Sequence, residues 1–350
     1  MRYAVGVGVP DCLVLGADVG GTSARFAIVD ARAESWTPLD VHVVPTATVA
    51  SFAEALGQVS RRGPGELAAA CIAVAGPVRG DRARLTNLPW EIHVREVAAQ
   101  LSVPAHRVLL INDLEAMAWA VPTLAPHHLF TLQPAQPEPG NVAVLAVGTG
   151  LGQAGLVWGE GGYRVFASEG GHADFAPRDE VEWGFARQLI ARWGHASWER
   201  VLSGPGLVDL YHYLVELRGA QVPAALGNLP AGHDPAAAVT AAALAGRCPV
   251  AVEAVQRFAG LLGAEAGNWA LKLLARGGVY VGGGIPPKLL PQLDEELFLK
   301  SFLAKGRMRP LLEMFPVHLI LDDGAGLRGA AVVAARLAAS GGCPRGPHRA

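Results

Sequence analysis

Asn112 and Asp113 stand where a buried strand is expected to give way to a helix. The apolar residues 109–111 predict the end of a strand, and residues 114–120 are good helix formers that run up to Pro122. A carboxylate at the carboxyl end of a buried strand lies where open α/β sheets bind ligands. Asp113 could equally be a helix cap, because Asn and Asp are favoured at that position. Taken alone, these residues leave both interpretations open.

A glycine turn near the N-terminus joins two expected strands, residues 13–19 and 24–30. Gly20 and Gly21 let the backbone approach a ligand closely and direct successive N–H groups at an anion. Asp18 adds a carboxylate suited to the Mg²⁺ that accompanies nucleotide phosphates, and Thr22 adds a hydroxyl. We therefore predict a phosphate-binding turn, with a tight turn that binds nothing as the alternative.

A second glycine-rich segment follows the expected strand at residues 141–147. Gly150, Gly152 and Gly155 match the GxGxxG pattern of dinucleotide-binding proteins, which requires a helix to begin at the glycines. Residues 154–165 instead predict a strand, a glycine turn and another strand. We therefore reject the dinucleotide fingerprint and predict a second phosphate-binding turn, with an NAD-dependent oxidoreductase as the alternative. Thr149 would correspond to the threonine of the first turn, and a third glycine turn at residues 282–284 is open enough for a base or ribose.

A polar cluster lies around two further glycines. Glu169, His172 and Asp174 flank residues 170–171, which indicates a loop wrapped tightly around something. Carboxylates accept hydrogen bonds and imidazole can donate or accept them, so a hydroxyl-rich ligand fits better than a metal, which needs at least three ligands in workable geometry. The alternative is a polar loop whose histidine is satisfied locally. The spacing around Glu199 gives no reason to prefer a functional role over a surface acid.

The composition is that of a globular protein with a large core. The chain has 350 residues, 51% of them hydrophobic and 17% charged, and a net charge of −2. No block of Lys or Arg stands out, which argues against nucleic acid as a partner. No long apolar span predicts a membrane helix or a signal peptide. Four scattered cysteines favour reduced thiols and a cytoplasmic location; they are Cys12, Cys71, Cys248 and Cys343.

Together these segments resemble the bacterial glucokinase family, a hexokinase-like group with the actin/Hsp70-type ATPase fold. The resemblance runs from about residue 14 to residue 330, and its motifs stand in the order of the family. They are ADVGGTSARFAIVD, INDLEA, GTGLGQAGLV, SEGGHADFAP, ERVLSGPGLVDLY and VYVGGGIPPKLL. The resemblance implies an α/β, two-domain actin-like ATPase (ribonuclease H-like) fold with an interdomain cleft. The small domain would comprise residues 1–122 and 322–350, and the large domain residues 123–321.

The resemblance also implies ATP-dependent phosphorylation of glucose at its 6-hydroxyl, with Asp113 as general base. The sugar would be held by Asn112, Asp113, Glu169, His172 and Glu199. The nucleotide would be held by Ala17, Asp18, Val19, Gly20, Gly21, Thr22, Gly148, Thr149, Gly150, Gly152, Gly282, Gly283 and Gly284. ATP and Mg²⁺ are the expected cofactors, with Asp18 contacting the metal through water, and a homodimer is expected. A kinase for another hexose and a non-catalytic protein that senses sugar and ATP are the alternatives.

Overall fold

The computed structural model describes residues 12–33, 36–60, 66–136, 138–227, 229–230, 232–289 and 295–340. The chain forms two compact units, residues 1–124 with 324–350 (unit 1) and residues 125–323 (unit 2). Both boundaries between the units lie two residues further along the chain than those expected for the two domains, 122 and 322. Whether each folds independently as a domain stays a prediction.

Unit 1 is built on a five-stranded sheet in the order β3-β2-β1-β4-β8. β1 and β2 form the predicted antiparallel hairpin, whereas β4 runs parallel to both β1 and β8. A small three-stranded sheet in the order β5-β6-β7 is formed by the residues between β4 and β8. The strands of unit 1 are β1 (Leu13–Val19), β2 (Ser23–Asp30), β3 (Asp40–Pro45), β4 (Leu67–Val74), β5 (Val78–Arg79), β6 (Arg82–Arg84), β7 (Glu91–His93) and β8 (Val108–Asn112).

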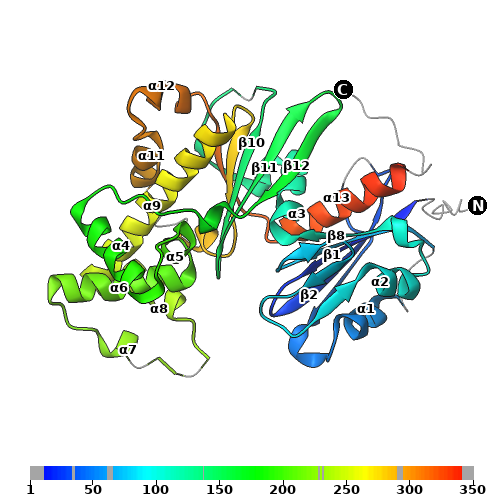
Figure 1. The fold of residues 1–350 in the computed structure, drawn as a ribbon, viewed down its shortest axis with the longest axis horizontal. Coiled ribbons are helices and arrows are strands. Elements are labelled where there is room, and N and C mark those ends of the chain that lie inside the picture. The colour runs from blue at the N-terminus through cyan, green and yellow to red at the C-terminus, as the bar shows by residue number, and fades with distance from the viewer. Residues whose placement is uncertain are drawn as a thin grey trace, which may run out of the picture. The chain divides into compact units, whose positions relative to one another are not determined.

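Helices cover both faces of the five-stranded sheet, which explains why β1 is apolar at almost every position (Figure 1). Leu15 contributes to the core that includes α1 and α2, whereas Val14 contributes to the core on the side of α13. Gly16 is required in between, because a Cβ there would lie 2.6 Å from the backbone nitrogen of Ala331 in α13. The helices of unit 1 are α1 (Phe52–Ser60), α2 (Val94–Leu101), α3 (Asp113–Ala120) and α13 (Ala325–Ala339).

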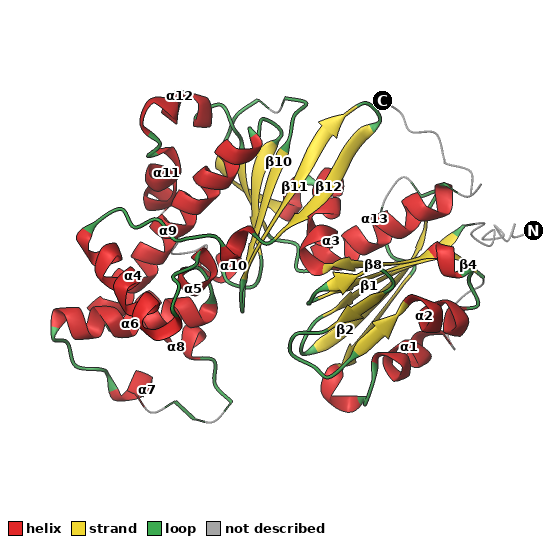
Figure 2. Cartoon of the chain, viewed as in Figure 1, coloured by secondary structure: helices red, strands yellow, loops and turns green. Residues whose placement is uncertain are grey.

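Unit 2 contains a six-stranded sheet in the order β12-β11-β10-β13-β14-β9. β10 pairs antiparallel with β11 and parallel with β13, so the second predicted glycine turn also joins two antiparallel strands. Helices and strands are distinguished by colour in Figure 2. The strands are β9 (Leu129–Gln133), β10 (Val142–Val147), β11 (Leu151–Gly159), β12 (Gly162–Ser168), β13 (Gly278–Gly282) and β14 (Val317–Ile320).

The long helix α9 is the centre of unit 2 and packs against α6, α8, α11 and the sheet. Pro249 opens it, as is common at a first helical position, and Leu274 ends it in the left-handed conformation at φ 50°. The helices of unit 2 are α4 (Glu180–Trp193), α5 (Trp198–Val201), α6 (Gly204–Arg218), α7 (Ala224–Gly227), α8 (Pro235–Leu244), α9 (Pro249–Leu273), α10 (Pro286–Leu289), α11 (Glu295–Leu303) and α12 (Arg309–Leu312).

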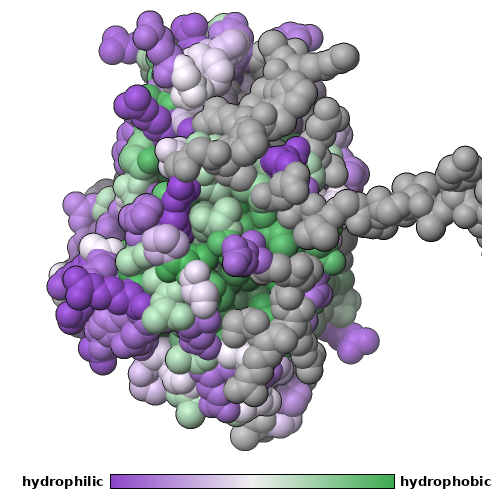
Figure 3. Space-filling model, turned by 90° about the vertical axis from the view of Figure 1, so that its right-hand side faces the viewer, coloured by the Kyte–Doolittle hydropathy of each residue, from purple (hydrophilic) through white to green (hydrophobic). Residues whose placement is uncertain are grey.

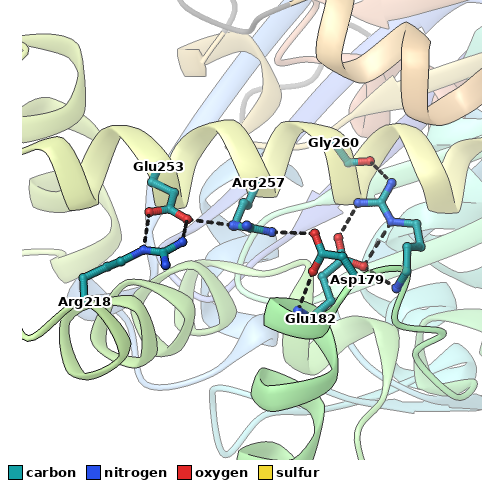
Figure 4. A network of polar contacts seen from close by, with 7 residues as sticks. Asp179, Glu182, Arg218, Glu253, Arg257 and Gly260 are labelled. Atoms are coloured by element: carbon teal, nitrogen blue, oxygen red, sulfur yellow. Dashed lines mark hydrogen bonds and ion pairs between the residues drawn. The ribbon is translucent and has the colours of Figure 1, made fainter.

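A chain of ion pairs runs along α9 (Figure 4). Arg218 at the end of α6 binds Glu253 at 2.7 Å, and Glu253 also binds Arg257 at 3.0 Å. Arg257 continues to Asp179 at 3.0 Å, and Asp179 caps α4 by accepting from the N–H of Glu182. The chain therefore links the ends of two helices to the central one.

The structure also bears on the state of the cysteines and on the expected lack of a membrane helix. Cys12 takes part in a disulfide bond, so the expectation of reduced thiols throughout is wrong for this residue, whereas Cys71 and Cys248 are free and buried. Among the described residues no single helix has the length and apolarity to cross a membrane. In that part of the chain, α8 and α9 are long and apolar enough only when they are taken together, and the two helices are bent by 106° at the break between them.

Candidate functional site

Unit 1 brings Asp18 and Asp113 to one edge of its sheet. Asp18 lies near the carboxyl end of β1, and Asp113 follows β8 directly. Both strands run parallel to β4, and the paired residues Val19, Val74 and Asn112 place the three strand ends level. The two carboxylates predicted from separate motifs are therefore neighbours in the fold, at the edge where α/β sheets bind ligands.

The two carboxylates influence each other electrostatically. The pKa of Asp18 is raised to about 6, chiefly by burial and also by the nearby Asp113, while Arg25 acts in the opposite direction. Like charges in a poorly hydrated environment disfavour simultaneous ionisation, so such a pair attracts a proton or a cation. Gly326 allows this arrangement, because a Cβ there would lie 3.1 Å from a carboxylate oxygen of Asp18.

The helix cap that was an alternative role for Asp113 is provided by its neighbour. The side chain of Asn112 accepts the N–H of Leu114 at 2.9 Å, and Asn112 is the N-cap residue of α3. Asp113 is the first residue of the helix, is partly buried, and accepts the same N–H at 2.9 Å. Capping therefore does not account for the carboxylate at position 113. The amide nitrogen of Asn112 faces the carbonyl of Gly76 at 3.4 Å.

The first glycine turn is bound by Thr46, a residue that the sequence did not single out. Thr46 donates its N–H to the carbonyl of Thr22 at 3.0 Å and its hydroxyl to the carbonyl of Gly21 at 2.7 Å. Within the turn, the N–H of Gly20 donates to the carbonyl of Ser23 at 3.0 Å. Nothing in the sequence marks Thr46, because its partners lie about 25 residues away along the chain. The expected nucleotide contacts Ala17 and Val19 have fully buried side chains, so only their backbone atoms remain as candidates.

Asn87 lies beside the same turn. A Cβ on Gly21 would be 3.4 Å from the Cβ of Asn87, so the missing side chain at Gly21 permits this approach. Asn87 stands in the segment between β6 and β7. The structure also shows an open pocket there, lined by Pro77, Arg84, Leu85, Thr86, Asn87, Leu88 and Pro89.

The second glycine turn, in unit 2, is a hairpin. Val147 pairs with Leu151, and the N–H of Gly148 donates to the carbonyl of Gly150 at 2.9 Å. β11 begins at Leu151 and contains Gly152 and Gly155, where a dinucleotide-binding protein would begin a helix, so the rejection of that fingerprint is confirmed. A Cβ on Gly150 would collide with a carboxylate oxygen of Glu199, so a side chain there would displace that carboxylate.

Glu199, whose role the sequence left open, is bound to this turn. Its Oε2 accepts the N–H of Leu151 at 3.1 Å, and its Oε1 lies 3.8 Å from Nδ1 of His172. The other ring nitrogen of His172 lies 3.8 Å from Glu169. Both separations are too long for hydrogen bonds. The side chains of Glu169 and His172 are 89% and 61% exposed, so the three polar groups stand together with room for a ligand's hydroxyls.

The third glycine turn lies next to the second. Gly283 has φ 96°, a conformation that favours glycine, and a Cβ there would collide with the backbone of Val147. Ile285 donates its N–H to the carbonyl of Val147 at 3.1 Å, at the end of the strand that leads into the second turn. Since β13 and β10 are parallel neighbours, the turns at their carboxyl ends form one edge of the unit 2 sheet.

The described residues contain no group of three or more His, Cys, Asp or Glu side chains arranged to hold a metal ion. A cation at Asp18 would have fewer than three such side chains as ligands among the described residues. This fits Mg²⁺, which keeps several waters and is bound through one or two carboxylates together with substrate phosphates.

Comparisons with known proteins agree with the predicted resemblance. A family model described as glucokinase matches residues 15–337. A glucokinase of Nostoc sp. is 39% identical over 346 residues, covering 93% of this chain and 99% of that protein. A glucokinase of Synechocystis sp. is 43% identical over 288 residues, covering 78% and 81%.

Solved structures give the same result. Glucokinase from an Antarctic psychrotroph superposes with a TM-score of 0.80 at 32% identity, covering 93% of this chain and 99% of that one. A ROK family glucokinase from Streptomyces griseus, in complex with glucose and AMPPNP, has a TM-score of 0.59 at 25% identity, with 93% and 99% covered. The predicted α/β actin-like ATPase fold is thereby confirmed, and the chain belongs to the glucokinase family.

Proposed function

We propose that this chain transfers the γ-phosphoryl group of ATP to the 6-hydroxyl of glucose, giving glucose 6-phosphate and ADP. Membership of the glucokinase family supports the activity and the substrate. The observation that carries the proposal is the partly buried Asp113, which opens α3 at the carboxyl end of β8 and lies close enough to Asp18 to raise its pKa.

Asp113 would serve as the general base. A sugar hydroxyl is a poor nucleophile, so its proton must leave as the bond between O6 and the γ-phosphorus forms and the bond to the leaving ADP oxygen breaks. The carboxylate of Asp113 accepts that proton. A positioned base contributes roughly 10²- to 10⁴-fold to the rate, so stabilisation of the phosphoryl charge must supply much of the remainder.

The two hairpin turns would bind the phosphates through their backbone. The N–H groups of Gly20 and Gly148 already donate within their own turns, so we expect the residues that follow them, Gly21, Thr22, Thr149 and Gly150, to contact phosphate oxygens. Asp18 would hold Mg²⁺ through water, and the ion would neutralise charge on the phosphates. The turn at residues 282–284 would lie near the adenosine.

Glu169, His172, Glu199 and Asn112 would bind the hydroxyls of the sugar. Their carboxylate, imidazole and amide groups offer both donors and acceptors. A site built from such groups rejects a sugar that lacks one hydroxyl by as much as ~10⁴-fold, because a polar group is then left unpaired. The position of Glu199, bonded to the N–H of Leu151, supports this role by joining the sugar contacts to the second phosphate turn.

A coupled assay with ATP, Mg²⁺ and a panel of hexoses tests the proposal. We expect glucose to give the highest kcat/KM and Asp113→Asn to abolish most of the turnover. A higher kcat/KM for another hexose would make the chain a kinase of that sugar. Binding of glucose and ATP without turnover would make it a sugar and nucleotide sensor.

A homodimer and a cytoplasmic location complete the proposal. Large hydrophobic side chains are exposed on α4, namely Trp183 at 53% and Ile190 at 51%. Hydrophobic residues also gather on a different face, the one drawn in Figure 3. Such surface is typical of protein contacts. Light scattering coupled to gel filtration measures the mass directly, and a monomer at micromolar concentration would contradict the dimer.

A further inference from the structure

A chain of buried and partly buried polar groups in unit 2 has no part in the function proposed above. Gln153 in β11 and Glu265 in α9 are both fully buried, and Nε2 of Gln153 donates to Oε1 of Glu265 at 2.6 Å. The second carboxylate oxygen accepts from Asn268 at 2.9 Å, and Lys305 donates to Asn268 at 2.6 Å. A buried carboxylate needs such partners, so Glu265 is fully engaged.

Glu265 decides which way the amide of Gln153 faces. An ionised carboxylate only accepts hydrogen bonds, so the NH₂ group of Gln153 must point toward it and the amide oxygen must point away. That oxygen is buried and has no hydrogen-bond partner in the described part of the chain. An unpaired buried acceptor is costly, and apolar packing alone would not require an amide here.

The amide oxygen of Gln153 lies against the segment that carries the predicted sugar contacts. A Cβ on Gly170 would collide with it, and Gly170 stands between Glu169 and His172. A Cβ on Gly171 would likewise collide with the carbonyl of Leu151 in the same strand. The tight turn at residues 169–172 therefore rests directly on β11, with one of its supports set by the orientation of Gln153.

We propose that Gln153, oriented by Glu265, is a positioning residue that holds the turn at residues 169–172 in the conformation that binds sugar. This rests on the proposed role of Glu169 and His172 in binding glucose. Neither Gln153 nor Glu265 touches the sugar in this proposal. They fix the backbone from which the sugar contacts project, because binding groups must be held closely in place by the residues behind them.

The test uses complementary changes of size, measured as KM for glucose and for ATP on the full chain. Gly170→Ala places a methyl group against the oxygen of Gln153 and is expected to raise KM for glucose by ~10-fold, with KM for ATP changed less than ~2-fold. Combining it with Gln153→Ala removes the colliding atom. The double variant should then have a KM for glucose at least ~3-fold below that of Gly170→Ala alone, yet still above that of wild type, because the turn has lost the support of Gln153.

Tyr211→Phe is the matched control, because Tyr211 is another fully buried polar side chain of unit 2, on α6. It should leave both KM values unchanged, which separates positioning from a general loss of stability. A double variant no better than Gly170→Ala, or equal changes in the two KM values, would overturn the proposal. Failure of the wild-type chain to phosphorylate glucose would instead overturn the proposed function, so the two failures are distinguishable.

Discussion

The two halves of this protein use the same local device in different surroundings. Each unit contains an antiparallel hairpin with a glycine turn, β1–β2 in unit 1 and β10–β11 in unit 2. Beside the first turn, Asp18 is partly buried and its pKa is raised to about 6, first by burial and then by Asp113. Beside the second, Glu169 and His172 are largely exposed.

The difference teaches how one motif serves two tasks. Carboxylates that lack water and repel each other are suited to taking a proton or facing a cation. An exposed and a partly exposed carboxylate, each 3.8 Å from the same imidazole and without a hydrogen bond to it, are suited to receiving hydroxyls. We therefore assign the chemistry to unit 1 and the recognition of the sugar mainly to unit 2, and each prediction below tests that division.

The largest effect is expected at Asp113. Asp113→Asn keeps an oxygen for the N–H of Leu114 but removes the base, so kcat should fall by at least ~10²-fold while the Kd for glucose, measured by calorimetry, stays within ~3-fold of wild type. Asp81→Asn, at an exposed carboxylate of the same unit, is the control and should be neutral. Near-normal turnover of Asp113→Asn would place the chemistry elsewhere.

Asp18→Asn should lower activity and raise stability together. The folded-state pKa of Asp18, about 6, lies above its ordinary value of 3.8. The folded protein therefore holds this proton to higher pH than the unfolded chain, and stability falls as pH rises between those two values. Removing the charge should raise the free energy of unfolding by up to ~3 kcal/mol at pH 7.

The gap between Asp18→Asn and wild type should be small near pH 4 and grow up to about pH 6, as followed by urea unfolding. In Asp113→Asn, one of the causes that raise the pKa of Asp18 is gone. The pH range over which wild-type stability falls should then move to lower values in that variant. An unchanged range would mean that the two carboxylates do not interact.

In unit 2, Glu169→Gln should affect one substrate selectively. Loss of a charged acceptor for sugar hydroxyls should raise KM for glucose by ~10- to 100-fold, with KM for ATP nearly constant. Glu160→Gln, at an exposed acid in the turn between β11 and β12, is the matched control. Equal losses for glucose and ATP would contradict the assignment of sugar recognition to unit 2.

The smallest effect concerns the ion pairs along α9, none of which includes a residue of the two turns. Hydrogen bonds and charge from Arg218 and Arg257 lower the pKa of Glu253, and the N–H of Glu182 together with Arg257 outweighs burial and lowers the pKa of Asp179. Such groups stabilise the fold above their ordinary pKa values of 4.5 and 3.8, and this stabilisation is lost as pH falls through the lowered values.

Arg257→Met should therefore lower the free energy of unfolding by no more than ~1 kcal/mol at pH 7, with the difference vanishing in acid. Its kinetics with glucose and ATP should match wild type. Arg309→Met, which removes an exposed pair with Glu313 within one short segment, should cost less. A kinetic effect of Arg257→Met would show that unit 2 is coupled to the reaction more widely than we propose.

Much of the local structure followed from the sequence. The hairpins and the buried strand β8 were predicted because continuous apolar residues and glycine turns are local signals. The rejection of the dinucleotide fingerprint also depended only on the strand-like residues after Gly152. Thr46, Gln153 and the capping role of Asn112 were missed or left open, since their significance lies in partners that the order of residues does not reveal.

The sequence by itself determined where glycines and carboxylates stand along the chain and, through its motifs, the family to which the chain belongs. Only the tertiary structure decided that Asp18 meets Asp113, that Glu199 binds the turn at Gly150, and that Gln153 supports Gly170. The physical reason is that strand pairing and helix packing bring distant segments together. The pKa of a carboxyl and the space beside a glycine depend on those neighbours and not on the adjacent residues.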